Sequence, residues 1–292
     1  HRLKSRSARE ECVVSASAVL VTGASTGIGR ATALALDARG ITVFAGVRKP
    51  ADGDALVAAG RHIVPLILDV TVAEQIAVAA RAIAESGIPL VGLVNNAGIA
   101  AAAPLEFIAV DDFRHQLEVN VVGQLAVTQS VLPLLRASKG RIVNITSIGG
   151  LISGPMLGPY HASKFALEAM TDTLRIELAP WGIGVAAIEP GQIATPIWAT
   201  ASAKADTMID GMPPEAAEFY AKGIAGARAS AKRAAAEGLP PERVADAIIH
   251  ALTAARPKTR YLVGSDAKLI GRVVRHLPDR LRDRMMVRRR SH

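Results

Sequence analysis

The sequence contains almost no cysteine. Cys12 is the only cysteine among 292 residues, so the chain can form no intrachain disulfide and no cysteine metal cluster. His115 and His161 have no metal-ligand partners at a suitable spacing, and we interpret both as structural or surface residues. The sequence therefore predicts neither a disulfide framework nor a metal site.

Long apolar runs are also missing. A membrane-spanning helix needs ~18 or more consecutive apolar residues, and no run in this chain approaches that length. Residues 13–21 follow charged residues, as in a signal peptide, but the stretch is short, contains serines and leads directly into Thr22 and Gly23. We interpret it as the approach to a first strand and expect a cytoplasmic protein.

Positive charge is confined to the two ends of the chain. The net charge is +8, yet residues 1–11 hold four basic against two acidic residues, and residues 272–292 hold eight arginines against two aspartates. These ends account for the whole excess, so residues 12–271 are formally neutral. A protein that follows a nucleic-acid backbone needs a basic surface on its body. We therefore expect no nucleic-acid partner.

Short apolar segments rich in β-formers alternate with longer alanine-rich segments of helical period. The predicted strands are 18–22, 42–47, 62–68, 90–95, 141–146, 184–188 and 260–263, and the predicted helices lie near 29–39, 54–59, 72–86, 111–135 and 160–179. This alternation is typical of βαβ units in a parallel sheet. The sequence predicts an α/β fold of one domain with a Rossmann-like, doubly wound parallel sheet, whose ligands bind at the carboxyl ends of the strands.

A glycine-rich turn follows the first predicted strand. Residues 22–29 read TGASTGIG, which places Gly23, Gly27 and Gly29 in a Gly-x3-Gly-x-Gly spacing. Such glycines permit a tight turn and let backbone N–H groups approach a pyrophosphate at a helix N-terminus. The spacing differs from the Gly-x-Gly-x-x-Gly fingerprint, and a purely structural turn remains the alternative.

Tyr160 and Lys164 stand four residues apart on a predicted helix, which puts the phenol and the ammonium on one face. Such a pair alone is common on solvated helices. Ser147, thirteen residues before Tyr160, follows the predicted strand 141–146. Because the end of a strand and the start of the next helix converge on one cleft, we expect these three side chains to meet.

Taken together, these residues resemble the short-chain dehydrogenase/reductase family. The match covers roughly residues 18–196 and rests on seven motifs in family order: residues 22–29, Asp69, residues 95–98 (NNAG), Asn120, Ser147, Tyr160 with Lys164, and Pro190 and Gly191 followed by Thr195. Residues 260–268 and 277–281 resemble the steroid- and retinol-dehydrogenase-like members in particular.

The resemblance implies catalytic roles for four residues. Tyr160 would be the general acid/base, with Lys164 and the oxidised nicotinamide favouring its phenolate. Ser147 would hydrogen-bond the substrate oxygen. Lys164 would also bind the nicotinamide ribose, and Asn120 would hold a water that connects Lys164 to solvent.

The resemblance also implies a set of cofactor-binding residues. Asp69 would accept a hydrogen bond from the adenine amino group, and Thr195 with the Ile193 backbone would fix the carboxamide. The full implied set is Gly23, Ser25, Thr26, Gly27, Ile28, Gly29, Arg48, Asp69, Val70, Asn96, Ala97, Gly98, Lys164, Pro190, Gly191, Ile193 and Thr195.

The segment after the second predicted strand indicates the cofactor. Enzymes of this fold that use NAD commonly place an acidic residue there, which repels a 2′-phosphate. Residues 43–49 read VFAGVRK, with no acid before Asp52, and Arg48 can fork onto a phosphate beside Lys49. Thr26 stands where many NADP-using relatives carry a second basic residue. We expect NADP(H) as the preferred cofactor and NAD(H) as the alternative; Arg48 as a solvated loop residue is the contrary interpretation.

The predicted activity is hydride transfer between a nicotinamide and the carbonyl or alcohol carbon of a small lipophilic substrate. Residues 199–237 would form a substrate lid, and apolar side chains in and beside it favour an apolar pocket: Ile197, Trp198, Met208, Met212, Phe219 and Tyr220. The alternatives are a 3-oxoacyl thioester reductase, a dinucleotide-binding regulator without catalysis, and a membrane-surface protein. The complete set of Ser147, Tyr160 and Lys164 argues against the regulator.

The predicted domain limits are a basic extension over 1–17, the NAD(P)-binding catalytic domain over 18–266 and a basic helical tail over 267–292. Family members pair the helices that correspond to 111–135 and 160–179, so we expect a homodimer or homotetramer. An apolar stripe runs along the tail through Leu269, Val273, Leu277, Leu281 and Met285. It predicts a basic amphipathic helix in peripheral contact with anionic lipid, and packing of the stripe on the protein is the alternative.

Overall fold

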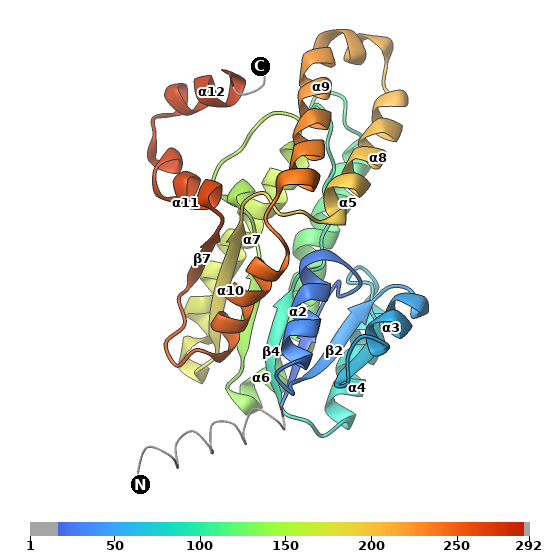
Figure 1. Cartoon of the computed structure of the whole chain (residues 1–292), viewed down its shortest axis with the longest axis vertical. Helices are drawn as coiled ribbons and strands as arrows, with labels where there is room; N and C mark the ends of the chain where they lie inside the picture. The colour runs from blue at the N-terminus through green and yellow to red at the C-terminus, as the bar shows by residue number, and fades with distance from the viewer. Residues whose placement is uncertain (1–16, 289–292) are drawn as a thin grey trace.

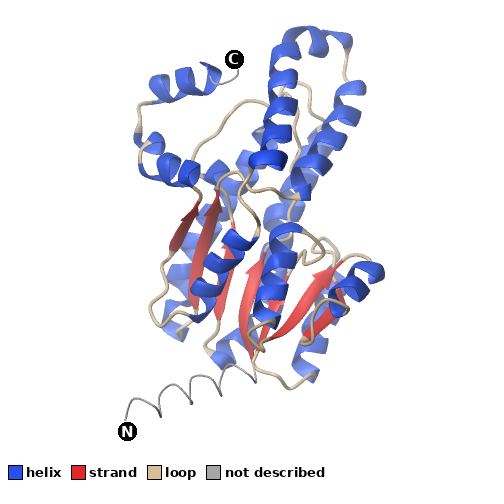
Figure 2. Ribbon diagram, viewed as in Figure 1, coloured by secondary structure: helices blue, strands red, loops and turns tan. Residues whose placement is uncertain are grey.

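Seven strands form the centre of the structure (Figures 1 and 2). The structure is a computed structural model and describes residues 17–288. The strands are β1 (Ala18–Val21), β2 (Thr42–Val47), β3 (Ile63–Ile67), β4 (Leu90–Asn95), β5 (Arg141–Ile145), β6 (Gly184–Pro190) and β7 (Arg260–Val263). Every predicted strand is present, with small differences at the ends.

The strand order is β3-β2-β1-β4-β5-β6-β7, and all neighbouring strands are parallel. The chain therefore adds β2 and β3 on one side of β1, and then adds β4 to β7 in sequence on the other side. The loops after β1 and β4 leave the sheet toward opposite faces, which opens a crevice at their carboxyl ends. The predicted Rossmann-like, doubly wound fold is confirmed.

Helices cover both faces of the sheet (Figure 1). One face carries α2 (Gly27–Asp37) and α10 (Glu242–Thr253), which pack together, and α3 (Pro50–Val57) near the β2–β3 edge. The other face carries α4 (Ala73–Glu85), α6 (Gly123–Ser138) and α7 (Gly158–Leu178).

The central strand β1 shows why its sequence is apolar at every position. Val19 and Val21 pack into the core beneath α2 and α10, whereas Ala18 and Leu20 pack into the core beneath α4, α6 and α7. Side chains alternate between the two faces of a strand. Because both faces are covered, each of the four residues is buried.

The predicted lid is a helical hairpin. Residues 199–237, which the sequence predicts as a substrate lid, lie in α8 (Pro196–Asp210), α9 (Pro214–Glu237) and the short turn between them. Each helix begins with proline, which suits the first turn because that position needs no N–H donor, and both are rich in alanine, a strong helix former. The hairpin rises beyond the carboxyl ends of the strands (Figure 1).

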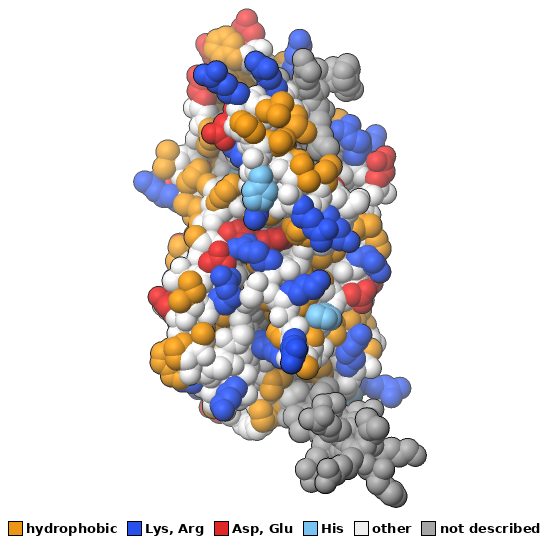
Figure 3. Space-filling model, turned by 90° about the vertical axis from the view of Figure 1, so that its left-hand side faces the viewer, with side chains coloured by type: hydrophobic (Ala, Val, Ile, Leu, Met, Phe, Trp, Pro, Cys, Tyr) orange, Lys and Arg blue, Asp and Glu red, His pale blue; other side chains and the backbone are white. Residues whose placement is uncertain are grey.

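The C-terminal segment forms α11 (Ser265–Arg272), the 3-10 turn η4 (Val274–His276) and α12 (Asp279–Arg288). These elements split the predicted apolar stripe. Leu277 and Met285 pack against the protein, whereas Leu269, Val273 and Leu281 are 50%, 50% and 47% exposed. The split arises because the backbone leaves the helical conformation at Val273. Figure 3 shows this side of the molecule, where arginines and hydrophobic side chains lie next to one another.

An ion cluster ties the outer strand β7 to the helix α7. Arg260 Nη1 pairs with Glu168 of α7 and lies 2.6 Å from Glu189 Oε1 of β6, and Nη2 lies 2.7 Å from Asp172 Oδ2. Burial raises the pKa of Glu189, and the neighbouring charge of Glu168 raises it further. The hydrogen bond from Arg260 and its charge act in the opposite direction and lower this pKa. The arginine thus compensates two buried carboxylates and fixes the end of the sheet against α7.

Candidate active site

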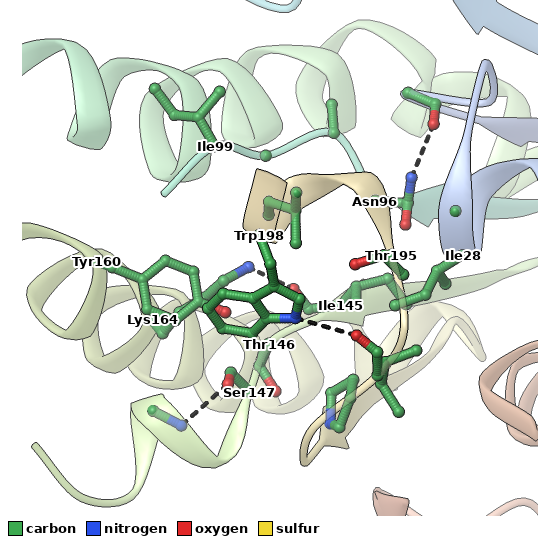
Figure 4. A pocket seen from close by; sticks show the side chains of 18 of the residues that line it. Ile28, Asn96, Ile99, Ile145, Thr146, Ser147, Tyr160, Lys164, Thr195 and Trp198 are labelled. Atoms are coloured by element: carbon green, nitrogen blue, oxygen red, sulfur yellow. Dashed lines mark hydrogen bonds between the residues drawn. The ribbon is translucent and has the colours of Figure 1, made fainter. Parts of the chain in front are cut away.

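A cavity of about 460 Å³ opens at the carboxyl ends of the strands, where the direction of the sheet order reverses. Its walls come from the turn after β1, the ends of β4, β5 and β6, the start of α7 and the first turn of α8. All but two of the sequence-predicted site residues line it, the exceptions being Gly29 and Asn120. Figure 4 shows part of this wall.

The glycine turn adopts a conformation that requires glycine. Gly23 and Gly27 have φ angles of +63° and +52°, a region that other residues rarely occupy. A Cβ on Gly29 would collide with the carbonyl oxygen of Gly23, so Gly29 lets α2 begin close against the turn. The first N–H groups of α2 have no partners within the helix and lie at the cavity. This turn fits an anionic group such as a pyrophosphate.

Asn96 holds the glycine turn in place. Its Nδ2 donates to the carbonyl oxygens of Thr22 and Gly23 at 2.9 and 3.0 Å. The Thr22 hydroxyl in turn accepts from the backbone N–H groups of Asn96 and Ala97, both at 3.0 Å. These bonds join the loop after β4 to the turn after β1, which fixes the width of the crevice between them.

Arg48 and Asp69 lie together at the far end of the cavity, after β2 and β3. Asp69 Oδ1 accepts from the Thr71 backbone N–H at 3.0 Å and from the Thr71 hydroxyl at 2.7 Å. Partial burial opposes ionisation of Asp69, but these bonds and the charge of Arg48 outweigh it and lower its pKa. The cavity therefore presents one ionised carboxylate and one exposed guanidinium at this end.

Ser147, Tyr160 and Lys164 meet at the opposite end of the cavity (Figure 4). Ser147 follows β5, and Tyr160 lies in the first turn of α7, one turn before Lys164. Lys164 Nζ donates to the Ile145 carbonyl at 2.8 Å and lies 5.7 Å from the centre of the Tyr160 ring. The three side chains predicted to meet in one cleft are thus together.

Burial shapes the titration of this group. It raises the pKa of the Tyr160 phenol, although a hydrogen bond with Ser147 acts in the opposite direction. It lowers the pKa of the Lys164 ammonium to about 8, against the favourable charge of Glu168. Burial therefore favours the neutral form of both groups, and a bound cation beside them would favour the phenolate of Tyr160.

Asn120 is placed by an irregular turn in a helix. The predicted helix 111–135 is interrupted between α5 (Val110–Leu117) and α6 by a π-helical turn, η1 (Glu118–Val122); such turns frequently occur at functional sites. Buried Asn120 Oδ1 accepts from the Ile99 N–H at 2.9 Å, and Nδ2 donates to the Ile99 carbonyl and Ser163 Oγ, both at 3.0 Å. Asn120 thus lies behind the cavity wall and connects the loop after β4 to α7.

The structure adds residues to the cavity that the sequence interpretation did not assign. His115 and His161, interpreted as structural or surface residues, both line it, and His161 Nδ1 lies 3.0 Å from the Gly149 carbonyl. Met286 of α12 also lines it, so the C-terminal segment contributes to the wall. No local sequence signal distinguishes these positions, because the fold alone brings them to the cavity.

Neither a metal-ligand cluster nor a membrane-spanning helix is formed by residues 17–288. Within residues 17–288, no three or more histidine, cysteine or acidic side chains are grouped as metal ligands. No helix in the same range has the length and apolar character to cross a membrane.

The burial of Lys164 predicts a pH-dependent contribution to stability. Its pKa is about 8 in the folded protein, against 10.5 for an ordinary lysine. Between these values the unfolded chain binds a proton that the folded chain has released. The free energy of unfolding therefore rises with pH, by at most about 1.4 kcal/mol per pH unit.

Urea titrations of the wild type and Lys164→Met at a series of pH values test this contribution. We expect the rise between about pH 8 and 10 in the wild type and its absence in the variant. Tyr160, whose pKa is raised, acts in the opposite direction only above pH 10 and is present in both proteins. An equal rise in both would show that Lys164 is not the source.

Comparisons with known proteins agree with this geometry. The family model for short chain dehydrogenase matches residues 17–206. Retinol dehydrogenase 5 from Mus musculus is 35% identical over 289 residues, which cover 95% of this chain and 90% of that protein. A 3-amino-tetrahydro-pyrrolizinone reductase from Xenorhabdus hominickii is 39% identical over 254 residues, covering 86% and 87%. A short chain dehydrogenase from Burkholderia cenocepacia, crystallised in complex with NADP, superposes with a TM-score of 0.70 at 28% identity, covering 93% of this chain and 96% of that one.

Proposed function

This chain belongs to the short-chain dehydrogenase family of oxidoreductases, and we propose that it uses NADP(H) to interconvert a carbonyl and an alcohol group on a lipophilic substrate. The observation that carries the proposal is the shared cavity: Tyr160, Ser147 and Lys164 lie at one end, and the glycine turn with Arg48 lies at the other. A dinucleotide whose nicotinamide reaches Tyr160 fits this arrangement.

The residues along the cavity match the parts of a nicotinamide dinucleotide, which supplies or accepts the hydride when bound. Gly23 and Gly27 leave room for the pyrophosphate at the start of α2, and Arg48 would hold the 2′-phosphate. Asp69 would bind the adenine, while Thr195 and the Ile193 backbone would hold the carboxamide. The complex of the Burkholderia cenocepacia relative with NADP supports this assignment.

Tyr160 would exchange a proton with the substrate oxygen. In the reducing direction its phenol donates the proton as the carbonyl carbon is reduced, and the Lys164 ammonium stabilises the phenolate that remains. Ser147 Oγ accepts from the Gly149 N–H at 3.0 Å and hydrogen-bonds with Tyr160, and in the bound complex its hydroxyl would donate to the substrate oxygen. Oxidation of an alcohol follows the reverse order.

Apolar side chains in the wall of the cavity favour an apolar substrate. They include Ile148, Ile152, Leu157, Ile197, Trp198 and Met286. Among the described residues that line the cavity, one is an arginine, Arg48, and one is a lysine, Lys164. Both are assigned to the cofactor. No cation is left for a phosphorylated carrier group, which favours a lipophilic alcohol or ketone over a 3-oxoacyl thioester. Similarity to retinol dehydrogenase 5 supports the same class.

A substrate panel tests the proposed function. NADP(H) consumption would be measured with aliphatic and aromatic ketones, secondary alcohols, a retinoid aldehyde and a 3-oxoacyl thioester. We expect the highest kcat/KM with a lipophilic ketone, aldehyde or alcohol. A higher value for the thioester would favour the reductase alternative, and tight cofactor binding without turnover of any compound would favour the regulator.

We also propose that this chain pairs with a second copy through α5, α6 and α7. Exposed apolar side chains on α5 and α7 support the pairing: Ile176, 70% exposed, Phe165, 44%, and Val110, 62%. Light scattering of the purified protein would give the mass of a dimer or tetramer, whereas the mass of a monomer would contradict the pairing.

The C-terminal helices support a peripheral contact with anionic lipid, in addition to catalysis. Leu269 and Val273 face solvent beside Arg272 and Arg275, which are also exposed. An apolar surface with flanking cations is the combination by which helices lie on anionic membranes.

Replacing both Leu269 and Val273 with serine is expected to weaken binding to vesicles that contain phosphatidylserine by about 10-fold, because two aliphatic side chains would no longer leave water. Vesicle pelleting measures the change. Val78→Ser removes a similarly exposed side chain on α4 and should leave pelleting unchanged. Equal pelleting of the double variant and the wild type would contradict the lipid contact.

A further inference from the structure

A second, smaller cavity lies within the lid. Its volume is about 50 Å³, and α8 and α9 provide most of its wall. It is lined by Ala102, Met156, Leu157, Trp198, Ala201, Ser202, Ala205, Ile209, Ile224, Ala227, Arg228, Ser230 and Ala231. Leu157, Trp198 and Ser230 also line the catalytic cavity. The two cavities are therefore neighbours that share one wall.

The small cavity is suited to an apolar group. The space exists because several of the side chains that face it from both helices are alanines, which are small. Ile209 and Ile224 add apolar surface to its wall. Arg228 is the charged residue of the lining, but its guanidinium pairs with Asp206 Oδ1 at 2.6 Å, where both side chains are about half exposed. The charge of Arg228 is thus paired with Asp206 near the surface, and it does not create an anion-binding site within the small cavity.

Trp198 is the largest side chain of the shared wall. It lies in the first turn of α8, directly after the loop that carries Ile193 and Thr195. Its indole N–H donates to the Ile193 carbonyl at 3.0 Å, which holds the ring at the edge of the catalytic cavity (Figure 4). Its removal would leave Leu157 and Ser230 as the shared boundary.

We propose that the cavity between α8 and α9 continues the substrate site behind Trp198, and that the indole closes it off and so sets the greatest length of the apolar substituent that the enzyme accepts. The inference rests on the proposed function, because it takes the substrate's reacting carbon to lie at Tyr160. About 10–15 Å³ of such space holds one water-sized group, so the small cavity accommodates an alkyl end of about three to five carbons beyond the tryptophan.

A homologous series of methyl ketones tests the role of Trp198. In the wild type, kcat/KM should rise with chain length, by about fourfold per buried methylene, and then stop rising where the chain reaches the indole. In Trp198→Ala the rise should continue to longer chains, with a gain of about 10-fold for the long ketones and a loss for the short ones.

Two further variants separate the effect of Trp198 on substrate length from other effects of its substitution. Trp198→Phe keeps an apolar ring but loses the bond to Ile193, and should show an intermediate cut-off. Trp181→Ala removes the other tryptophan, which is 47% exposed and stacks on Arg136, and should keep the wild-type profile. An identical length profile in Trp198→Ala and the wild type would overturn the proposal.

A binding measurement keeps this test independent of turnover. With NADP(H) present, long primary alcohols should raise the Tm of Trp198→Ala more than that of the wild type, since a ligand stabilises the state that binds it. Ala227→Leu in the Trp198→Ala background should fill the distal cavity and abolish the difference. If no compound is turned over but long alcohols still raise the Tm of Trp198→Ala more than that of the wild type, the proposed reaction is refuted and the distal cavity is not. If compounds are turned over without this difference in Tm, the distal cavity alone is refuted.

Discussion

Replacing Tyr160 with phenylalanine is expected to lower turnover by about 100- to 10,000-fold, the usual size of a general acid/base contribution. The ring remains in its place at the start of α7, so the shape of the cavity is preserved. Only the phenolic proton is lost. Because the substitution leaves every assigned cofactor-binding side chain in place, the Kd for NADP(H) should stay close to the wild-type value.

Steady-state kinetics on a confirmed substrate, with cofactor binding measured by fluorescence, test this expectation. Tyr261→Phe provides a matched control. It also removes a phenol, but that phenol lies in β7 and binds His250 Nδ1 at 2.8 Å, away from the lining of the cavity. Near wild-type turnover in Tyr160→Phe would mean that another group transfers the proton.

Replacing Arg48 with alanine is expected to reduce the preference for NADP(H) over NAD(H) by about 10- to 150-fold. Charge-assisted hydrogen bonds contribute about 1.5 to 3 kcal/mol, and a factor of ten corresponds to about 1.4 kcal/mol. The structure supports this assignment, since Arg48 lines the cavity directly after β2, close enough to Asp69 to lower its pKa. The effect should fall on NADP(H) alone, because NAD(H) has no 2′-phosphate.

The ratio of kcat/KM for the two cofactors measures this effect. Arg61→Ala is a suitable control, because it removes an exposed arginine just before β3, at the opposite end of the strands from the cavity. A wild-type preference for NAD(H), or an unchanged ratio in Arg48→Ala, would refute Arg48 as the residue that reads the phosphate.

The sheet could be predicted from the sequence because its signal is local. β1 is buried on both faces, so Ala18 to Val21 form an unbroken apolar run, and the glycines after it have conformations that only glycine adopts readily. The catalytic side chains follow from the same logic. Once β5 and α7 are placed, Ser147 and Tyr160 must meet at the carboxyl edge.

Features that depend on distant contacts could not be predicted. The hairpin of α8 and α9 buries few apolar side chains, among them Ala216 and Ile224, so its sequence lacks a strong helical stripe. The π-helical turn that points Asn120 at Ile99 adds one residue to a helix without any change in composition. Met286 reaches the cavity only because α11 and η4 turn the chain back over it.

The most direct test of the account is the fate of the hydride. The wild-type enzyme would reduce a lipophilic ketone with NADPH that carries deuterium at both hydrogen positions of C4 of the nicotinamide, and mass spectrometry and NMR would locate the label in the alcohol. We expect one deuterium on the carbinol carbon of each product molecule, and we expect Tyr160→Phe to form this alcohol far more slowly. An alcohol without deuterium at that carbon, or equal rates of formation in both proteins, would contradict this expectation.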